Sequence, residues 1–245
     1  MNIVSIKDRP LLGILGGMGM QATDYFCRMI TNMQNVKSEQ EYLDMLVYYR
    51  PSIPDRTDYI LGKSKLNPLP FILKGVCDLE KAGVSTIVIP CVTSHYFYDQ
   101  LQESTGIPIL DIIKETTDYI ADNGFNKVGL LATSGTIAGG FLVEALNVAG
   151  VEVVIPSDSD QVTLMDIIYS LKQNKVVRPA ELDNHVKNLL FMGAEVIILG
   201  CTELSLLSDE HEYFADAVEL LAKAALQICH CEEQSDEAIY KRILT

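Results

Sequence analysis

The sequence is poor in basic side chains. Its 245 residues contain 19 lysines and arginines against 33 aspartates and glutamates, which gives a formal net charge of −14. This balance disfavours a nucleic-acid-binding surface, because contacts with phosphates need clustered lysine and arginine. An anionic substrate would have to be held by a few local cations against the overall field. The arginines and lysines near candidate catalytic residues therefore become important.

Long uninterrupted apolar runs are also absent near the start of the chain. The first ten residues have no basic region followed by an apolar core, and glycines interrupt the apolar stretch that comes next. Neither a signal peptide nor a membrane span is therefore expected. The six cysteines are too unevenly spaced for a disulfide framework in a chain of this length. Free thiols suit a reducing compartment, so we expect a cytoplasmic protein.

The chain lacks a dinucleotide-binding fingerprint, although Gly16-Gly17-Met18-Gly19 follows its first strand-like run. The glycine spacing is wrong, and no acidic residue is placed to bind a ribose. At such a turn, backbone amides at a helix N-terminus can contact an anion, which makes Met18 and Gly19 candidate substrate contacts. The alternative is a tight strand-to-helix turn without a ligand.

A regular alternation of strand-like and helix-like segments is present. Strand-like runs occupy residues 11–15, 45–49, 86–90, 108–110, 127–131, 151–155 and 195–199. Helix-like segments occupy residues 22–33, 70–81, 112–121, 141–148, 163–172 and 180–190. The alternation predicts an α/β protein whose parallel sheets are covered by helices on both faces.

The two halves of the chain resemble each other. Residues 12–19 are similar to residues 128–135, at an offset of 116, and Cys91 and Cys201 are 110 residues apart. Such similar offsets predict a duplication. A turn-rich stretch then divides the chain into one domain of residues 1–122 plus 209–245 and another of residues 123–208. We expect a helix over 216–229 to return to the first domain, and a frayed helix or disordered tail to follow it.

Cys91 and Cys201 each end a β-branched apolar run that is typical of a buried parallel strand. Open α/β sheets bind their ligands at the carboxyl ends of such strands. Two thiols that face each other across a small pocket could remove a proton and return one to the opposite face without a cofactor. A single buried cysteine is often only structural, but equivalent positions in two halves favour a shared function.

A titratable residue follows each of these cysteines. His95 lies four residues after Cys91, and Glu203 lies two residues after Cys201. A protonated His95 would favour the thiolate of Cys91, whereas a carboxylate at Glu203 would favour the thiol of Cys201. That asymmetry would suit a two-base mechanism. The alternative is that either residue caps a turn.

Candidate cations lie near the second strand and at the end of a predicted helix. Arg56, in a proline-stiffened loop, could grip a carboxylate with two hydrogen bonds, and Arg50 precedes this loop. Lys172 could supply a further positive charge. The alternatives are a surface Asp/Arg pair in the loop and a solvent-exposed lysine.

Hydroxyl side chains gather at the same predicted strand ends. Thr133 and Thr136 open the second half, where they could bind a carboxylate or simply cap a helix, and Thr93 and Thr202 follow the two cysteines. No metal site is expected. The run Cys229-His230-Cys231 is too tightly spaced for structural zinc and lacks a second pair of ligands.

These motifs, in this order, resemble the aspartate/glutamate racemase family, and most of all its aspartate racemase branch. The resemblance extends from about residue 11 to residue 226. It is carried by residues 13–19 with 22–23, 53–57, 90–95, 129–136, 168–172 and 200–203. The resemblance implies two flavodoxin-like, doubly wound domains related by pseudo-twofold symmetry, with an active site between them and neither pyridoxal phosphate nor a metal. It also implies a homodimer.

The resemblance further assigns roles to individual residues. It implies that Cys91 and Cys201 are the acid/base pair and that Arg56 and Lys172 bind substrate carboxylates. This chain departs from the family's usual asparagines at two places, where it has Arg50 and Val92. We expect Val92, beside Cys91, to be the main difference from an ordinary aspartate racemase.

The expected function is cofactor-independent racemisation of an acidic amino acid, aspartate above all. Two alternatives stay open. An isomerase or decarboxylase of a small dicarboxylate could use the same fold, but decarboxylation would need only one cysteine. A non-catalytic protein would bind an acidic amino acid without exchanging its α-proton.

Overall fold

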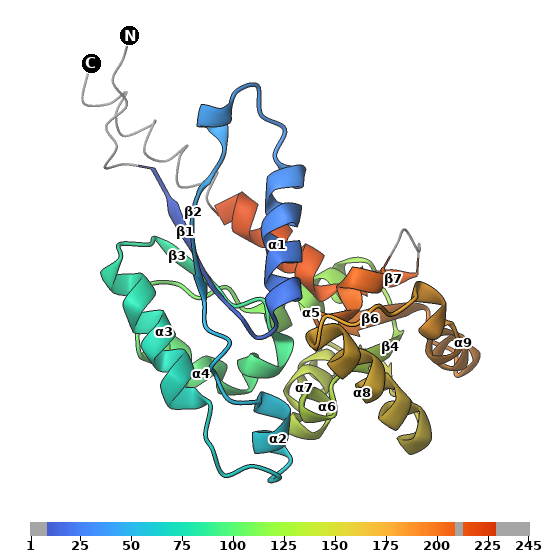
Figure 1. Ribbon diagram of the computed structural model, residues 1–245. Helices are drawn as coiled ribbons and strands as arrows, with labels where there is room; N and C mark the ends of the chain where they lie inside the picture. Colours follow the sequence, from blue (N-terminus) through green and yellow to red (C-terminus); the bar gives the residue numbers. More distant parts are fainter. Residues whose placement is uncertain (1–8, 209–212, 229–245) are drawn as a thin grey trace.

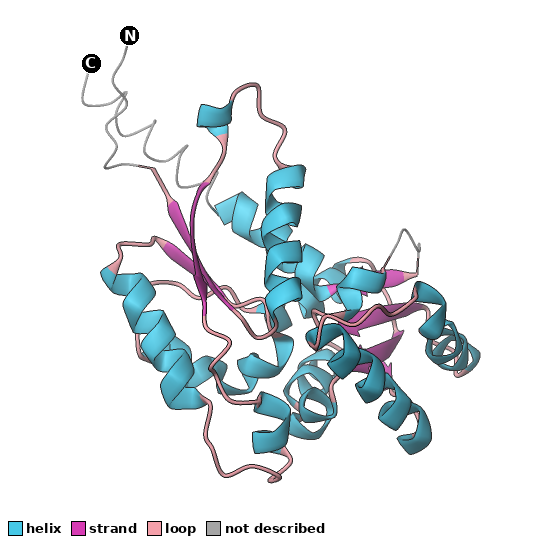
Figure 2. Ribbon diagram, viewed as in Figure 1, coloured by secondary structure: helices cyan, strands magenta, loops and turns pink. Residues whose placement is uncertain are grey.

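The computed structural model describes residues 9–208 and 213–228, which form two parallel β-sheets with helices between and outside them (Figures 1 and 2). The first sheet contains β1 (Leu11–Gly16), β2 (Asp44–Tyr49) and β3 (Thr86–Val88) in the order β2-β1-β3. The second contains β4 (Lys127–Ala132), β5 (Glu152–Val154), β6 (Val196–Gly200) and β7 (Phe214–Asp216) in the order β5-β4-β6-β7. The prediction of an α/β protein with two parallel sheets is confirmed.

The two sheets repeat one pattern of strand pairing. In the first sheet Gly13 of β1 lies opposite Ile87 of β3, and in the second sheet Gly129 of β4 lies opposite Ile197 of β6. The strand position beyond β3 in the first sheet also matches the position of β7 in the second. Ile109 makes a parallel bridge to Ile87 of β3, just as β7 pairs with β6. The internal repeat seen in the sequence is therefore a repeat of sheet order and register.

Helices of the first half connect its strands. They are α1 (Met20–Met33), α2 (Arg56–Ile60), α3 (Leu69–Lys81), α4 (Tyr98–Glu103) and α5 (Ile112–Asp122), with 3-10 turns η1 (Glu39–Glu41) and η2 (Val92–Phe97). The second half has α6 (Ser134–Gly139), α7 (Phe141–Val148), α8 (Asp158–Lys172) and α9 (Asp183–Phe191), with η3 (Pro179–Glu181) and η4 (Leu204–Leu207). A further helical segment spans residues 217–228.

Hydrophobic packing divides the molecule into an inner layer and two outer ones. The inner cluster contains Leu12 and Ile14 of β1 together with Val128 and Leu130 of β4, so both sheets share it. Separate clusters lie where α3 packs on the first sheet and where α8 and α9 pack on the second. Figure 1 shows α1 and segment 217–228 between the two sheets. This shared layer fixes how the strand ends of the two halves face each other.

The segment after β6 has contacts in both halves. β7 pairs with β6 and therefore belongs to the second sheet, although residues 209–245 were expected in the first domain. Beyond β7, segment 217–228 lies beside α1, where Tyr25 interacts electrostatically with Asp216 and Glu219. The Cys229-His230-Cys231 run and the expected tail lie outside the described residues.

Three predicted elements differ in detail from the structure. The expected strand at 108–110 is reduced to the single bridge at Ile109. α8 begins five residues earlier than expected, because the Ser157 side chain caps its first turn by accepting a hydrogen bond from the Asp160 amide. The expected helix at 180–190 is divided into η3 and α9. Nowhere in the described ranges is a helix both long enough and apolar enough to cross a membrane.

Candidate active site

Cys91 and Cys201 occupy equivalent positions at the carboxyl ends of β3 and β6. Each lies four residues after the isoleucine, Ile87 or Ile197, that pairs with the central strand of its sheet. Cys91 precedes η2, and Cys201 precedes η4. Both residues are only 4% exposed. The repeated topology thus places two buried thiols at matching sheet edges.

Arg56, the first residue of α2, is the cation beside Cys91. It is 6% exposed, and its guanidinium donates hydrogen bonds to the carbonyl oxygens of Met18 at 2.9 Å and Pro54 at 3.1 Å. Burial lowers the pKa of Arg56, but Cys91, to which it also hydrogen-bonds, and nearby carboxylates outweigh this effect and raise it. Within the described part of the chain, the buried Nε has no hydrogen-bonding partner. One donor therefore remains free for a ligand.

Lys172, the last residue of α8, connects the two cysteines electrostatically. Burial and repulsion from Arg56 lower the pKa of this partly buried lysine. The Glu203 carboxylate, Cys201 and Cys91 raise the pKa by more, so the net shift is upward. Its Nζ lies 5.3 Å from the centre of the Tyr169 ring. The structure therefore brings Lys172, Arg56 and both cysteines into one site.

Glu203 holds Cys201 as a thiol. The Cys201 Sγ donates a hydrogen bond to Glu203 Oε2 at 3.1 Å, and the Thr202 hydroxyl donates to the same oxygen at 3.4 Å. Burial raises the pKa of Cys201 well above its usual value, and Glu203 raises it further, while Lys172 lowers it less. Cys201 is therefore neutral and carries a proton at neutral pH. This matches the role expected for Glu203.

Three threonine hydroxyls join the two halves. Thr93 of η2 lies 3.0 Å from both Thr133 and Thr136, and the latter two are 3.1 Å apart, measured between their Oγ1 atoms. Thr133 also caps α6 by accepting a hydrogen bond from the Thr136 amide. Two of these threonines were expected at a helix N-cap, and the structure shows that cap in contact with η2 of the other half.

The glycine-rich turn lies close to two of the charged side chains. Gly17 has φ of +91°, and a Cβ there would lie 2.6 Å from the Arg50 backbone nitrogen, so only glycine fits. The next residue, Met18, supplies the carbonyl that accepts from Arg56. A Cβ at Gly19 would lie 2.8 Å from Glu203 Oε1. The turn therefore lies between Arg56 and Glu203.

Arg50 does not join the candidate site. Its guanidinium donates a hydrogen bond to the Phe71 carbonyl of α3 at 2.7 Å and lies 5.5 Å from the Tyr48 ring centre. Arg50 follows Tyr48 by two residues, and side chains two positions apart in a strand share a face. The expectation that Arg50 binds substrate is corrected, because its side chain points to the α3 side of the sheet.

His95 contacts the backbone of Cys91 rather than its sulfur. Its Nδ1 lies 3.0 Å from the Cys91 carbonyl oxygen, and its Nε2 lies 3.4 Å from the Leu110 carbonyl oxygen. Burial lowers the pKa of His95 more than Asp111 raises it. The imidazole is therefore neutral at pH 7, so the expected imidazolium beside a Cys91 thiolate is wrong. His95 braces the turn that carries Cys91.

Val92 lies in the apolar layer shared by the two halves. Its side chain is buried in the inner hydrophobic cluster, together with Ala132 of β4 and Leu142 of α7. The hydroxyl and charged groups of the site come instead from its neighbours. At this departure from the family's asparagine, the side chain therefore packs in the layer shared by the two halves.

Asp55 and Tyr169 were not singled out from the sequence, yet they flank Lys172. The Tyr169 hydroxyl donates a hydrogen bond to Asp55 Oδ2 at 3.2 Å, which links α8 to the loop before α2. Burial raises the pKa of Asp55, but Lys172, Arg56 and two hydrogen bonds together lower it more. Burial and Asp55 raise the pKa of Tyr169 to about 12. The i, i+3 spacing of Tyr169 and Lys172 was the available sequence signal.

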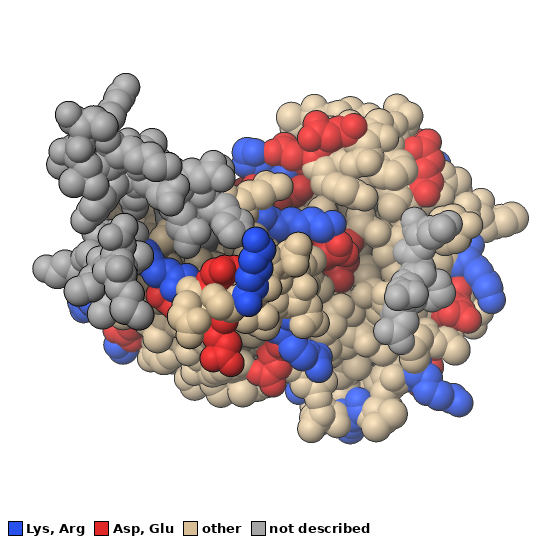
Figure 3. Space-filling view, turned by 90° about the horizontal axis from the view of Figure 1, so that it is seen from above, with Lys and Arg blue, Asp and Glu red and all other residues tan. Residues whose placement is uncertain are grey.

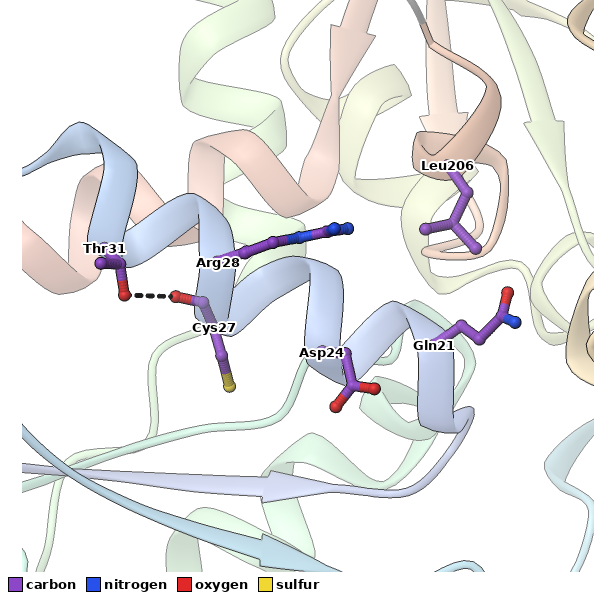
Figure 4. Close-up of a pocket in the computed structure, with 6 residues that line it drawn as sticks. All are labelled: Gln21, Asp24, Cys27, Arg28, Thr31 and Leu206. Atoms are coloured by element: carbon purple, nitrogen blue, oxygen red, sulfur yellow. Dashed lines mark hydrogen bonds between the residues drawn. The ribbon is translucent and has the colours of Figure 1, made fainter.

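A separate pocket of about 630 Å³ lies along α1 and reaches Leu206 of η4 (Figure 4). It is lined by Gln21, Asp24, Cys27, Arg28, Thr31 and Leu206. Asp24 and Arg28 carry opposite charges, and Asp24 already accepts a hydrogen bond from Tyr49. Burial and Asp24 raise the pKa of Cys27, which keeps this thiol neutral. The pocket contains neither candidate catalytic cysteine.

The surface carries mixed charge. On the face shown in Figure 3, acidic and basic side chains are interspersed. Across residues 9–208 and 213–228, no group of three or more histidine, cysteine or carboxylate side chains could hold a metal ion.

A comparison with models of protein families shows which family the chain belongs to. The model of the family described as Asp/Glu/hydantoin racemase matches residues 15–225. The chain belongs to this family. The resemblance inferred from the sequence motifs is thereby confirmed, and with it an enzyme of the isomerase class.

Individual racemase-family members are similar over most of their length. The broad specificity amino-acid racemase RacX of Bacillus subtilis is 28% identical over 204 residues, which covers 81% of this chain and 88% of RacX. The aspartate racemase of Picrophilus torridus is 27% identical, with a TM-score of 0.79 over 90% of this chain and 94% of that one. A glutamate racemase structure from Francisella tularensis, 18% identical with a TM-score of 0.63 over 93% of this chain and 83% of that one, shares the fold.

Proposed function

We propose that the protein is a cofactor-independent racemase of an acidic amino acid, with aspartate as the preferred substrate. The observation that carries this proposal is that Lys172 interacts with Cys91 and with Cys201, two thiols at equivalent strand ends. The similarity to the Picrophilus torridus aspartate racemase supports an acidic substrate. The similarity to RacX leaves room for other amino acids.

Arg56 and Lys172 bind the substrate carboxylates. The free Nε of Arg56 supplies one directed donor, and the Lys172 ammonium supplies a second positive charge. As the α-proton leaves, negative charge spreads onto the α-carboxylate. Fixed cations in a site shielded from water stabilise that charge strongly.

The two cysteines have different roles in the reaction. The Arg56 guanidinium hydrogen-bonds to Cys91, which acts as the base, whereas Glu203 keeps Cys201 as a thiol, which acts as the proton donor. The Cys91 thiolate takes the α-proton, and the electron pair stays on the carbanionic substrate. The Cys201 thiol then gives its proton to the opposite face of the same carbon. After this turnover Cys91 is the thiol and Cys201 is the thiolate. These protonation states are the ones that the reverse reaction needs.

Incubation with each enantiomer of aspartate and of glutamate in deuterated water tests this function. We expect loss of optical rotation together with α-deuterium incorporation. Cys91→Ala and Cys201→Ala should each abolish racemisation. Absence of exchange for every acidic amino acid would contradict the proposal and favour a binding protein, and release of carbon dioxide would favour a decarboxylase.

The assembly and location of the protein stay predictions. We propose a homodimer in the cytoplasm, as the family resemblance and the free thiols suggested. The four cysteines among the described residues, Cys27, Cys77, Cys91 and Cys201, are all unpaired. The molar mass in solution, measured by light scattering, tests the dimer.

A further inference from the structure

Glu203 is a buried carboxylate with one oxygen in use and one free. It is 2% exposed, and its Oε2 accepts hydrogen bonds from Cys201 and Thr202. In the described part of the chain, its Oε1 has no hydrogen-bonding partner. A buried acceptor without a partner is costly, and more so when it belongs to a charged group. The free oxygen is therefore positioned to accept a hydrogen bond from a ligand.

The cations of the site do not occupy this oxygen. Lys172 and Arg56 both interact electrostatically with Glu203. Among the ion pairs within 4.0 Å that the described residues form, however, none includes Glu203. A positively charged group of a small ligand can therefore contact Oε1 directly.

The site contains a second free polar atom of the opposite kind. Arg56 Nε is a buried donor without a partner, while Glu203 Oε1 is a buried acceptor without one, again among the described residues. A carboxylate would satisfy the donor, and an ammonium would satisfy the acceptor. An α-amino acid carries these two groups on one carbon, whereas a simple dicarboxylate carries only the first kind.

We propose that Glu203 Oε1 binds the α-ammonium group of the substrate and so restricts the enzyme to amino acids. This inference rests on the proposed function for the identity of the reacting carbon. Glu203 Oε2 lies 3.1 Å from the Cys201 Sγ, which protonates that carbon. The ammonium group is bonded to the same carbon, so one carboxylate can contact both the proton donor and the amine.

Gly19 leaves the space that this contact needs. A Cβ at position 19 would lie 2.8 Å from Glu203 Oε1, closer than real Cβ contacts. Gly19 is also the N-cap residue of α1, so the carboxylate stands near the positive end of that helix. A purely structural role as the anion of this helix end is the competing explanation, and the experiment must separate the two.

The test compares two ligands that differ only in the amino group. Aspartate and succinate share both carboxylates, and isothermal titration calorimetry at pH 7.5 measures the Kd of each for wild-type protein and for Glu203→Gln. We expect the substitution to weaken aspartate binding by about 10- to 100-fold and to leave succinate binding equal or tighter. Equal weakening of both ligands would overturn the inference, and so would no change in either.

Two further variants control for folding and electrostatics. Asp216→Asn removes another buried carboxylate, one held by Ser205 and the Val218 amide, and should preserve the preference for aspartate. Gly19→Ala keeps the charge of Glu203 but displaces Oε1, so it should lower the affinity for aspartate more than that for succinate. If Glu203→Gln does not fold, this second variant still decides the question, and an unchanged preference in it would contradict the inference.

Steady-state racemisation kinetics distinguish failure of the ammonium-site inference from failure of the proposed function. Recognition of the ammonium by Glu203 predicts a raised KM for aspartate in Glu203→Gln. A role confined to Cys201 predicts instead a shifted pH profile of kcat with an unchanged KM, which would overturn the inference. If the wild-type protein racemises no amino acid but still binds aspartate through Glu203, the proposed function is wrong and the inference of an ammonium site is supported.

Discussion

Tyr169 of α8 donates a hydrogen bond to Asp55, 3.2 Å away in the loop before α2. Asp55 also caps α2 by accepting from the Asp58 amide, and α2 begins with Arg56. Tyr169 lies on the same helix as Lys172, whose charge faces Asp55. One hydrogen bond between the halves thus links the elements that carry Arg56 and Lys172.

Replacing Tyr169 by phenylalanine should disturb substrate binding. Loss of the hydrogen bond to Asp55 frees α8 from the α2 loop, so we expect a KM for aspartate about 3- to 10-fold higher. Steady-state racemisation kinetics measure this. Tyr98→Phe is the control, because it also removes one tyrosine hydroxyl, but that hydroxyl donates within the first half, to the Ile109 carbonyl. An equal KM change in both variants would argue against the bridge.

Arg56 and Arg50 should respond very differently to substitution by lysine. Lysine keeps the charge but loses the fork that contacts Met18, Pro54 and a carboxylate, so Arg56→Lys should lower kcat/KM by at least about 100-fold. Arg50→Lys should change it by less than about 3-fold, because the Arg50 guanidinium binds the Phe71 carbonyl of α3. A large loss of kcat/KM in Arg50→Lys would contradict the site as described.

The threonine cluster should contribute to stability across the two halves. Thr136→Val has a similar shape but lacks the hydroxyl that contacts Thr93 and Thr133, so we expect a loss of about 1 kcal/mol in the free energy of unfolding. Urea denaturation measures it. Thr136→Ser keeps the hydroxyl and should lose less, and an equal or larger loss in the serine variant would show that the methyl group matters instead.

Asp216 should make stability depend on pH. Burial raises its pKa from 3.8 to about 6, despite hydrogen bonds from Ser205 and the Val218 amide. A raised pKa gives stability that is full below the unfolded value and is lost as the pH rises through about 6. Relative to Asp216→Asn, wild-type protein should therefore lose about 2 kcal/mol of unfolding free energy between about pH 4.5 and about pH 7. Parallel pH profiles of the two proteins would contradict this.

The cysteine pair was predictable because its signal is local and repeated. Continuous apolar runs predict buried parallel strands, and the strand that ends at Cys201 is buried along its whole length. Gly13 pairs with Ile87 in the first sheet as Gly129 pairs with Ile197 in the second, so the two registers follow from the same repeat. Sequence periodicity therefore carried both the fold and the position of the thiols.

The contacts between the halves were not predictable in the same way. The bond from Tyr169 to Asp55 joins positions 114 residues apart, and no local pattern pairs them. The direction of Arg50 was readable in part, since it shares a strand face with Tyr48. The charge of His95 depends on its burial against two carbonyl groups, which only tertiary structure reveals.

The central claim is that Cys91 and Cys201 act on opposite faces of one carbon, and the position of solvent deuterium tests it most directly. L-Aspartate is incubated with the enzyme in deuterated water, and the reaction is stopped at about 5% conversion. The two enantiomers are then separated and analysed by mass spectrometry. Two opposed thiols predict α-deuterium in the D-aspartate formed and almost none in the remaining L-aspartate. Equal deuterium in both enantiomers would contradict the account, because a single base would then serve both faces.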